Sequence, residues 1–247
     1  MANKHFGLVL VAAALVAASA ALYALHYAIF ADARHIWIYL LGDIAFLPLE
    51  VLLVAIVIER LLARHERRQL LHRMNMLIGT FFGELGIRLL GQVAPAIVNR
   101  DEVLQNLAVA ADWTPARFKA ALRQAARLEF QVDPKRLDLA AMKAMLTARR
   151  DLLVLLLANP NLLEHEQFTD LLWAVFHLMA ELEARPSLGD LPESDRQHLA
   201  GDAKRAYGHL AAEWLHYCRH LQHAYPYIFS IVLRTHPFQE QPSAIVR

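Results

Sequence analysis

Two carboxylic acids interrupt a long apolar stretch near the start of the chain. Asp43 and Glu50 lie seven residues apart, so an α-helix would carry both on one side. An ionised carboxylate at the centre of a bilayer costs about 2.5–3.5 kcal/mol on insertion scales, and such residues usually face a bundle interior or a water-filled cavity. One interpretation is that the two acids line a cation or proton path between protomers. The alternative is that Glu50 is protonated, or hydrogen-bonds within a bundle, and only fixes packing.

Histidines gather on one face of the last long helix that the sequence predicts. Eight polar residues between positions 198 and 223 recur at spacings of three or four, and five of them are histidines. These spacings place them on one arc of about 80° of the helix surface. Because solvated faces usually favour Lys, Glu and Arg, this composition suggests metal binding or pH sensing. We call the following residues the histidine stripe: His198, Asp202, Arg205, His209, Glu213, His216, His220 and His223.

The preceding helix carries a polar stripe of its own, formed by Glu166, Asp170, His177 and Glu181. A short loop joins the two helices, which predicts antiparallel neighbours. Helical bundles hold metal ions with carboxylates and Glu-x-x-His pairs, of which Glu213 and His216 form one. Imidazole suits zinc, copper, nickel or iron, so a transition metal such as zinc is the one cofactor that the sequence suggests. A di-metal centre needs two such pairs, so a solvated or inter-subunit polar face is the alternative. The candidate ligands are His198, His209, His216, His220, Glu166, Asp170 and Glu181.

The elements that must position these side chains begin with a membrane hairpin. Residues 6–30 and 36–58 form two apolar helices long enough to cross a hydrocarbon core of about 30 Å. The run Ala18 to Ala20 fits a signal-peptide cleavage site, but the apolar segment continues beyond it, which favours an uncleaved helix. Five arginines between residues 60 and 73 place that end, and both termini, in the cytoplasm. Since two helices cannot enclose a pore, conduction would require a homo-oligomer.

The remainder of the chain predicts helices, which makes the fold all-α. We expect the transmembrane hairpin over residues 1–60, a stalk and membrane-proximal helix over 61–92, and a cytosolic all-α domain, a helical bundle, over 93–247. The segment NMLIGTFFGELGIRLLG contains Glu84 and Arg88, so we expect a buried or membrane-surface helix there. Proline after a capping residue marks three helix starts, at Thr114-Pro115, Asp133-Pro134 and Asn159-Pro160. The helices expected in the last domain cover 101–111, 115–129, 134–158, 160–184, a long helix ending near 224, and a short aromatic helix within 225–238.

Composition excludes several classes of protein. The formal net charge of +1 gives no argument for nucleic-acid binding. The single cysteine, Cys218, excludes an internal disulfide framework and is expected to be buried. Phosphate-loop, dinucleotide-binding, GxSxG and HExxH motifs are absent, so the sequence predicts no enzyme. The mean hydropathy of +0.28 is high for a soluble protein and indicates the lipid bilayer as a partner.

Four sequence segments resemble a family of uncharacterised prokaryotic membrane proteins. They are an apolar helix running into ERLLARHERR, then NMLIGTFFGELG, NPNLLEHEQFTDLLWAVFHL and YPYIFSIVLRTHPF. The resemblance covers most of the chain. It implies the inner, cytoplasmic membrane of a prokaryote and carries over no activity and no site residue.

Three functions are compatible with these features. The specific function that the sequence favours is an oligomeric inner-membrane protein that passes cations along Asp43 and Glu50 under the control of its cytosolic domain. The second is a non-conducting membrane scaffold or signalling partner. The third is a membrane-anchored helical protein that binds metal or senses pH through the histidine stripe.

Overall fold

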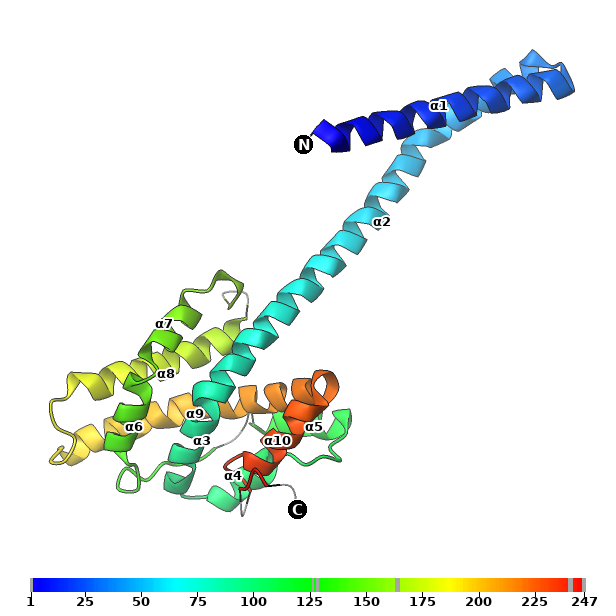
Figure 1. Ribbon diagram of the computed structural model, residues 1–247. Helices are drawn as coiled ribbons and strands as arrows, with labels where there is room; N and C mark the ends of the chain where they lie inside the picture. The colour runs from blue at the N-terminus through cyan, green and yellow to red at the C-terminus, as the bar shows by residue number, and fades with distance from the viewer. Residues whose placement is uncertain (1, 126, 128, 163–164, 240–241, 246–247) are drawn as a thin grey trace. The chain divides into compact units, whose positions relative to one another are not determined.

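The computed structural model describes residues 2–125, 127, 129–162, 165–239 and 242–245, and its elements are helices (Figure 1). The predicted all-α class is therefore confirmed. The chain divides into two compact units, Met1–Arg67 and Arg68–Arg247, which we call the N-terminal and C-terminal units. The predicted divisions lie near residues 60 and 92, whereas residues 68–92, expected in the stalk and membrane-proximal helix, lie in the C-terminal unit.

The N-terminal unit consists of α1 (Ala2–Phe30) and the first part of α2 (Ala33–Phe81). The connection is shorter than the expected loop, because only two residues separate the helices. Ala31 adopts a positive φ of 46°, and the Asp32 Oδ1 accepts hydrogen bonds from the amides of Arg34 and His35 at 2.9 and 3.2 Å. By length and composition, both helices are apolar enough to cross a membrane. The most apolar segment of each helix has no buried residues.

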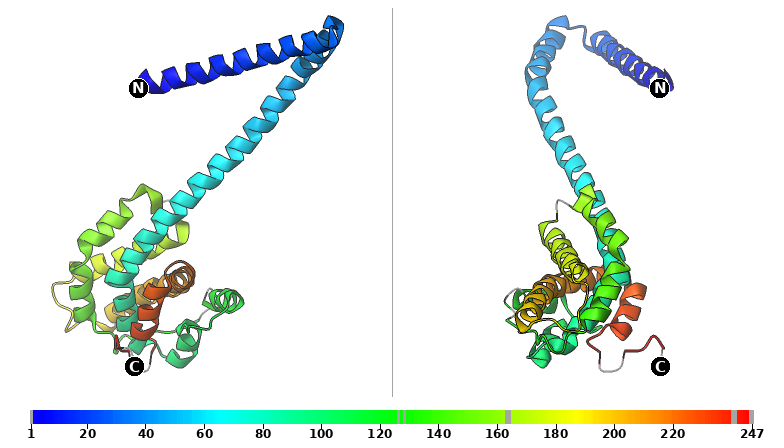
Figure 2. Two further views of the ribbon diagram at one scale, coloured as in Figure 1. Left: turned by 45° about the vertical axis from the view of Figure 1, so that its right-hand side comes forward. Right: turned by 90° about the vertical axis from the view of Figure 1, so that its left-hand side faces the viewer.

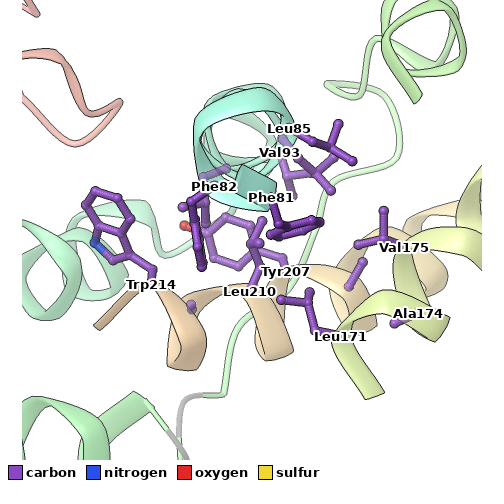
Figure 3. Packing of buried hydrophobic residues seen from close by; sticks show 14 of the residues in the cluster. Phe81, Phe82, Leu85, Val93, Leu171, Ala174, Val175, Tyr207, Leu210 and Trp214 are labelled. Atoms are coloured by element: carbon purple, nitrogen blue, oxygen red, sulfur yellow. The ribbon is translucent and has the colours of Figure 1, made fainter. Parts of the chain in front are cut away.

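The end of α2 enters the core of the C-terminal unit. A π-helical segment (Phe82–Gly86) and α3 (Ile87–Val93) follow it directly. Phe81, Phe82 and Leu85 are fully buried, so the structure supports the buried alternative for the NMLIGTFFGELGIRLLG segment. Figure 3 shows Phe81 and Phe82 pointing toward the neighbouring helices at the level of Tyr207 and Leu210.

The rest of the C-terminal unit packs around two long helices. In Figures 1 and 2, α8 (yellow-green) runs beside α9 (yellow to orange), and this pair has the most extensive helix contact of the unit. An isolated antiparallel bridge joins Ile97 to Val132. The further elements are η2 (Ala94–Ala96), α4 (Arg100–Leu107), α5 (Pro115–Ala125), α6 (Leu139–Thr147), α7 (Arg150–Leu157), η3 (Pro160–Leu162), α8 (Glu166–Ala184), α9 (Glu193–Ala224) and α10 (Pro226–Thr235).

Of the three helix starts expected at a proline, the one at Pro115 is correct and the two at Pro134 and Pro160 are wrong. Thr114 caps α5 through a 3.2 Å hydrogen bond from the Arg117 amide, as expected. The helix expected over 134–158 is wrong in its start and its continuity: Asp138, not Asp133, caps an α-helix, and the segment divides into α6 and α7. Pro160 begins only the short η3, and α8 starts later, where the His165 Nδ1 accepts a hydrogen bond from the Phe168 amide at 3.1 Å.

Aromatic side chains hold the end of α2 against α8 and α9. Phe81 meets Phe168 edge-on at 5.4 Å, and Phe82 stacks on Tyr217 at 4.7 Å between ring centroids. The Trp214 Nε1 donates to the Leu107 carbonyl at 2.9 Å, so the indole nitrogen is satisfied inside the core. Cys218 is buried, as expected.

Gly86 at the end of the π-helical segment leaves space for these rings, which yields a test of the packing. A Cβ at Gly86 would lie 2.7 Å from Phe82 Cδ1, whereas a Cβ at Gly83 would meet nothing within 4 Å. We expect Gly86→Ala to lower the free energy of unfolding by about 1–3 kcal/mol through overpacking. Gly83→Ala should leave it unchanged or raise it slightly, because alanine restricts the unfolded chain. Denaturant unfolding of the full-length protein in detergent measures both, and equal effects of the two variants would contradict the packing.

Candidate metal centre

The connection between α8 and α9 is held by one arginine. The Arg185 Nη1 donates to the Glu181 Oε2 at 2.8 Å, and the Arg185 Nε donates to the Asp195 Oδ2 at 2.7 Å. These contacts join the last turn of α8 to the first turn of α9. The hydrogen bond from Arg185 is the main reason that the pKa of Glu181 lies below its ordinary value, so this carboxylate stays ionised at neutral pH.

Four side chains lie immediately beside this connection. The His177 Nε2 and the His198 Nε2 each lie 3.4 Å from the Asp202 Oδ2. The same two nitrogens lie 3.9 and 3.5 Å from the two carboxylate oxygens of Glu181. Two residues come from α8 and two from α9. We call His177, Glu181, His198 and Asp202 the four-residue cluster.

Asp202 is the buried member of this cluster. Its side chain is 3% exposed, whereas the two imidazoles are about half exposed. The Arg205 Nη1 lies 3.1 Å from the Asp202 Oδ1, and the Oδ2 has no hydrogen-bond partner among the described residues. Arg205 thus orients the carboxylate, and the oxygen that it leaves free is the one that faces both imidazoles.

The cluster has the donor set of a site for a divalent transition metal. Glu181, His198 and Asp202 each offer one ligand atom, and these atoms lie within 4.8 Å of one another. A tetrahedral ion with bonds of about 2.0–2.1 Å holds its ligand atoms about 3.3 Å apart. The separations of 3.4–3.9 Å from the two imidazoles to the carboxylates are therefore close to those of a bound ion.

The structure divides the predicted metal ligands among several places. Glu181 and His198 meet in the four-residue cluster. His209 and Asp170 border a separate cavity, and His216 and His220 border another. The seven residues therefore do not form one centre, because α9 is 32 residues long and its stripe extends over most of its length. Glu166 is exposed in the first turn of α8.

His177 and Asp202 lie on the two predicted polar stripes but are not among the predicted ligands. The missed signal is their spacing: His177 precedes Glu181 by four residues, and His198 precedes Asp202 by four. Residues four apart lie on one face of a helix. Two such pairs at the joined ends of antiparallel helices face each other, which is the arrangement that the structure shows.

The predicted intramembrane acids lie in the N-terminal unit. Asp43 borders a cavity of about 550 Å³ that is also lined by Tyr23, His26 and His35. The His26 and His35 rings stack with centroids 5.7 Å apart. Glu50 is exposed on α2 and does not line this cavity.

Comparison with known proteins places the whole chain in one family. Residues 70–234 match the C-terminal helical domain of the uncharacterized protein MJ1433, and residues 3–62 match the N-terminal helical domain of MJ1433. The protein named "Uncharacterized protein MJ1433" from Methanocaldococcus jannaschii is 36% identical over 241 residues, which cover 98% of this chain and 96% of the relative. No solved structure matches. The resemblance to an uncharacterised prokaryotic family is thus confirmed, and the chain belongs to the MJ1433 family of proteins with an N-terminal and a C-terminal helical domain.

Proposed function

We propose that this protein is a membrane-anchored metal-binding protein that holds a divalent transition-metal ion, such as zinc, between α8 and α9. The observation that carries the proposal is the convergence of Glu181, His198 and Asp202, whose ligand atoms lie within 4.8 Å of one another, with the His177 Nε2 also 3.4 Å from the Asp202 Oδ2. Two nitrogens and two oxygens are a donor set that zinc accepts, and imidazole also suits copper, nickel and iron.

The burial of Asp202 supports a ligand over a solvated polar face. A buried carboxylate oxygen without a donor costs free energy, because nothing replaces the water that it loses. A metal ion would satisfy that oxygen and both imidazoles at once. Arg205 and Arg185 would act from outside, fixing the orientation of the Asp202 and Glu181 carboxylates. Their positive charges oppose a dication, so we expect weaker binding than at a thiolate site.

The apolar helices support anchoring in a bilayer. The segment Val9–Phe30 has a mean hydropathy of 2.0, the helix that begins at Ala33 reaches 2.4, and neither window is buried. The arginines between residues 60 and 73 then put the metal-binding unit on the cytoplasmic side of a prokaryotic inner membrane. This topology, and assembly into a homo-oligomer, are parts of the proposal.

Cation conduction by such an oligomer is the second candidate, and the exposed Glu50 favours it. A carboxylate on an apolar helix surface needs a polar neighbour or water, which other protomers could supply. We expect Glu50→Gln to keep assembly and to reduce cation flux into reconstituted vesicles, because it removes the charge that attracts the ion. Wild-type vesicles that stay tight to cations across pH and voltage would leave packing as the role of Glu50.

Zinc titration of the purified full-length protein tests the metal site. We expect one zinc ion per chain in isothermal titration calorimetry, and a rise in the unfolding temperature, since zinc binds the folded state. Loss of an outer-shell partner costs about 10- to 100-fold in metal affinity, so removal of a ligand in His198→Ala or Asp202→Asn should cost at least as much.

The matched control is His209→Ala, which removes another histidine of the same stripe that lies outside the cluster. It should bind zinc like the wild type. Absence of stoichiometric zinc binding by the wild-type protein, or equal losses in all three variants, would contradict the site.

A further inference from the structure

A second cavity in the C-terminal unit has the size of a small-molecule site. It has a volume of about 600 Å³, within the usual range of ligand pockets, and none of the four cluster residues lines it. Helices α2, α5 and α9 supply its walls. Apolar atoms come from Met74, Ile78 and Phe118, and Glu213, His216 and Tyr217 of α9 also line it.

Glu213 is the unusual member of this lining. It is 1% exposed, and neither carboxylate oxygen has a hydrogen-bond partner among the described residues. It also borders the neighbouring cavity that contains His209. A buried carboxyl group without donors destabilises the fold, and an apolar residue would pack there without that cost. The missing donors are therefore expected from a ligand.

The charges around the cavity favour a cationic ligand. The His165 Nδ1 accepts a hydrogen bond from the Phe168 amide, and the His216 Nδ1 lies 3.5 Å from the Arg219 Nη2, a group that can only donate. Burial also lowers the pKa of His216 to about 4. Glu213 is then the acidic group of the lining, and its pKa, raised by burial to about 7, allows it to ionise when a cation arrives. Arg219, which is exposed, is the opposing charge.

The other walls fit an organic cation better than a metal ion. Among the described residues, metal-ligating atoms converge at Glu181, His198 and Asp202, and they do not converge in this cavity. The rings of Phe118 and Tyr217 line it and can face an ammonium group or an apolar body.

We propose that this cavity binds a small organic cation, a primary amine with a short apolar body, whose ammonium group pairs with Glu213. The apolar body lies against Met74, Ile78 and Phe118, and the neutral His216 adds no positive charge to the lining. This site goes beyond the metal function, because it uses none of the cluster residues.

Calorimetry on the full-length protein in detergent, with a chelator present to remove metal, tests the proposal. The probes are phenethylamine and n-hexylamine, with 2-phenylethanol as the neutral counterpart of the first. We expect saturable binding of at least one amine and no comparable binding of the alcohol. Glu213→Gln should weaken amine binding by about 10- to 100-fold, as loss of a charged hydrogen-bond partner does.

Two controls separate the outcomes. Glu166→Gln removes an exposed carboxylate from α8 and should bind amine like the wild type. Asp202→Asn should also bind amine normally, so loss of zinc binding and loss of amine binding are distinguishable. The proposal is overturned if neither amine binds the wild-type protein, if the alcohol binds as well as the amine, or if Glu213→Gln retains wild-type affinity. The comparison of amine with alcohol uses wild-type protein, so it holds even if the variant fails to fold.

Discussion

The contact between α8 and α9 determines where the four-residue cluster lies. Arg185 fixes the register of this contact, because it binds Glu181 on one helix and Asp195 on the other. With that register set, the i,i+4 pairs of the two helices face each other and Asp202 becomes buried opposite two imidazoles. A different register would place the same residues beside unrelated neighbours.

The aromatic core makes this helix pair a rigid support. Phe81, the last residue of α2, packs on Phe168 near the start of α8, and Phe82, the first residue of the π-helical segment, stacks on Tyr217 of α9. The junction of these two segments therefore contacts both helices. The π-helical segment after Phe81 lets consecutive phenylalanines enter the core, and Gly86 leaves room for their rings. The four-residue cluster and the groups around Glu213 thus project from one packed unit, which would limit the entropy lost on binding a ligand.

Helix content and the outline of the chain could be predicted from the sequence, since hydrophobic periodicity and proline positions are local signals. The two apolar helices, the buried segment after Met74 and the long α9 follow from such signals. The division into α6 and α7 could not be predicted in this way. It depends on Asp138, whose side chain caps the start of α6. The side chains of Asp133 and Asn159 also accept hydrogen bonds from nearby amides, but the turns that they cap do not continue as α-helices.

The candidate site was only half predictable for a related reason. One helical wheel shows which residues of one helix share a face, so Glu181 and His198 could each be assigned to the polar face of its own helix. It cannot show which residues of two helices are level with each other, so His209, His216 and His220 were grouped with His198 although they border other cavities. The register that Arg185 fixes depends on both helices and on the loop between them. The hydrophobic periodicity of one helix therefore cannot predict it.

X-ray absorption spectroscopy at the zinc edge tests most directly whether α8 and α9 share a metal ion. In wild-type protein loaded with one equivalent of zinc, we expect four nitrogen or oxygen neighbours at about 2.0–2.1 Å, with the outer-shell scattering of two imidazole rings. In His198→Ala, one imidazole contribution should disappear. A wild-type spectrum without imidazole scattering, or one that His198→Ala leaves unchanged, would contradict a metal ion between these helices.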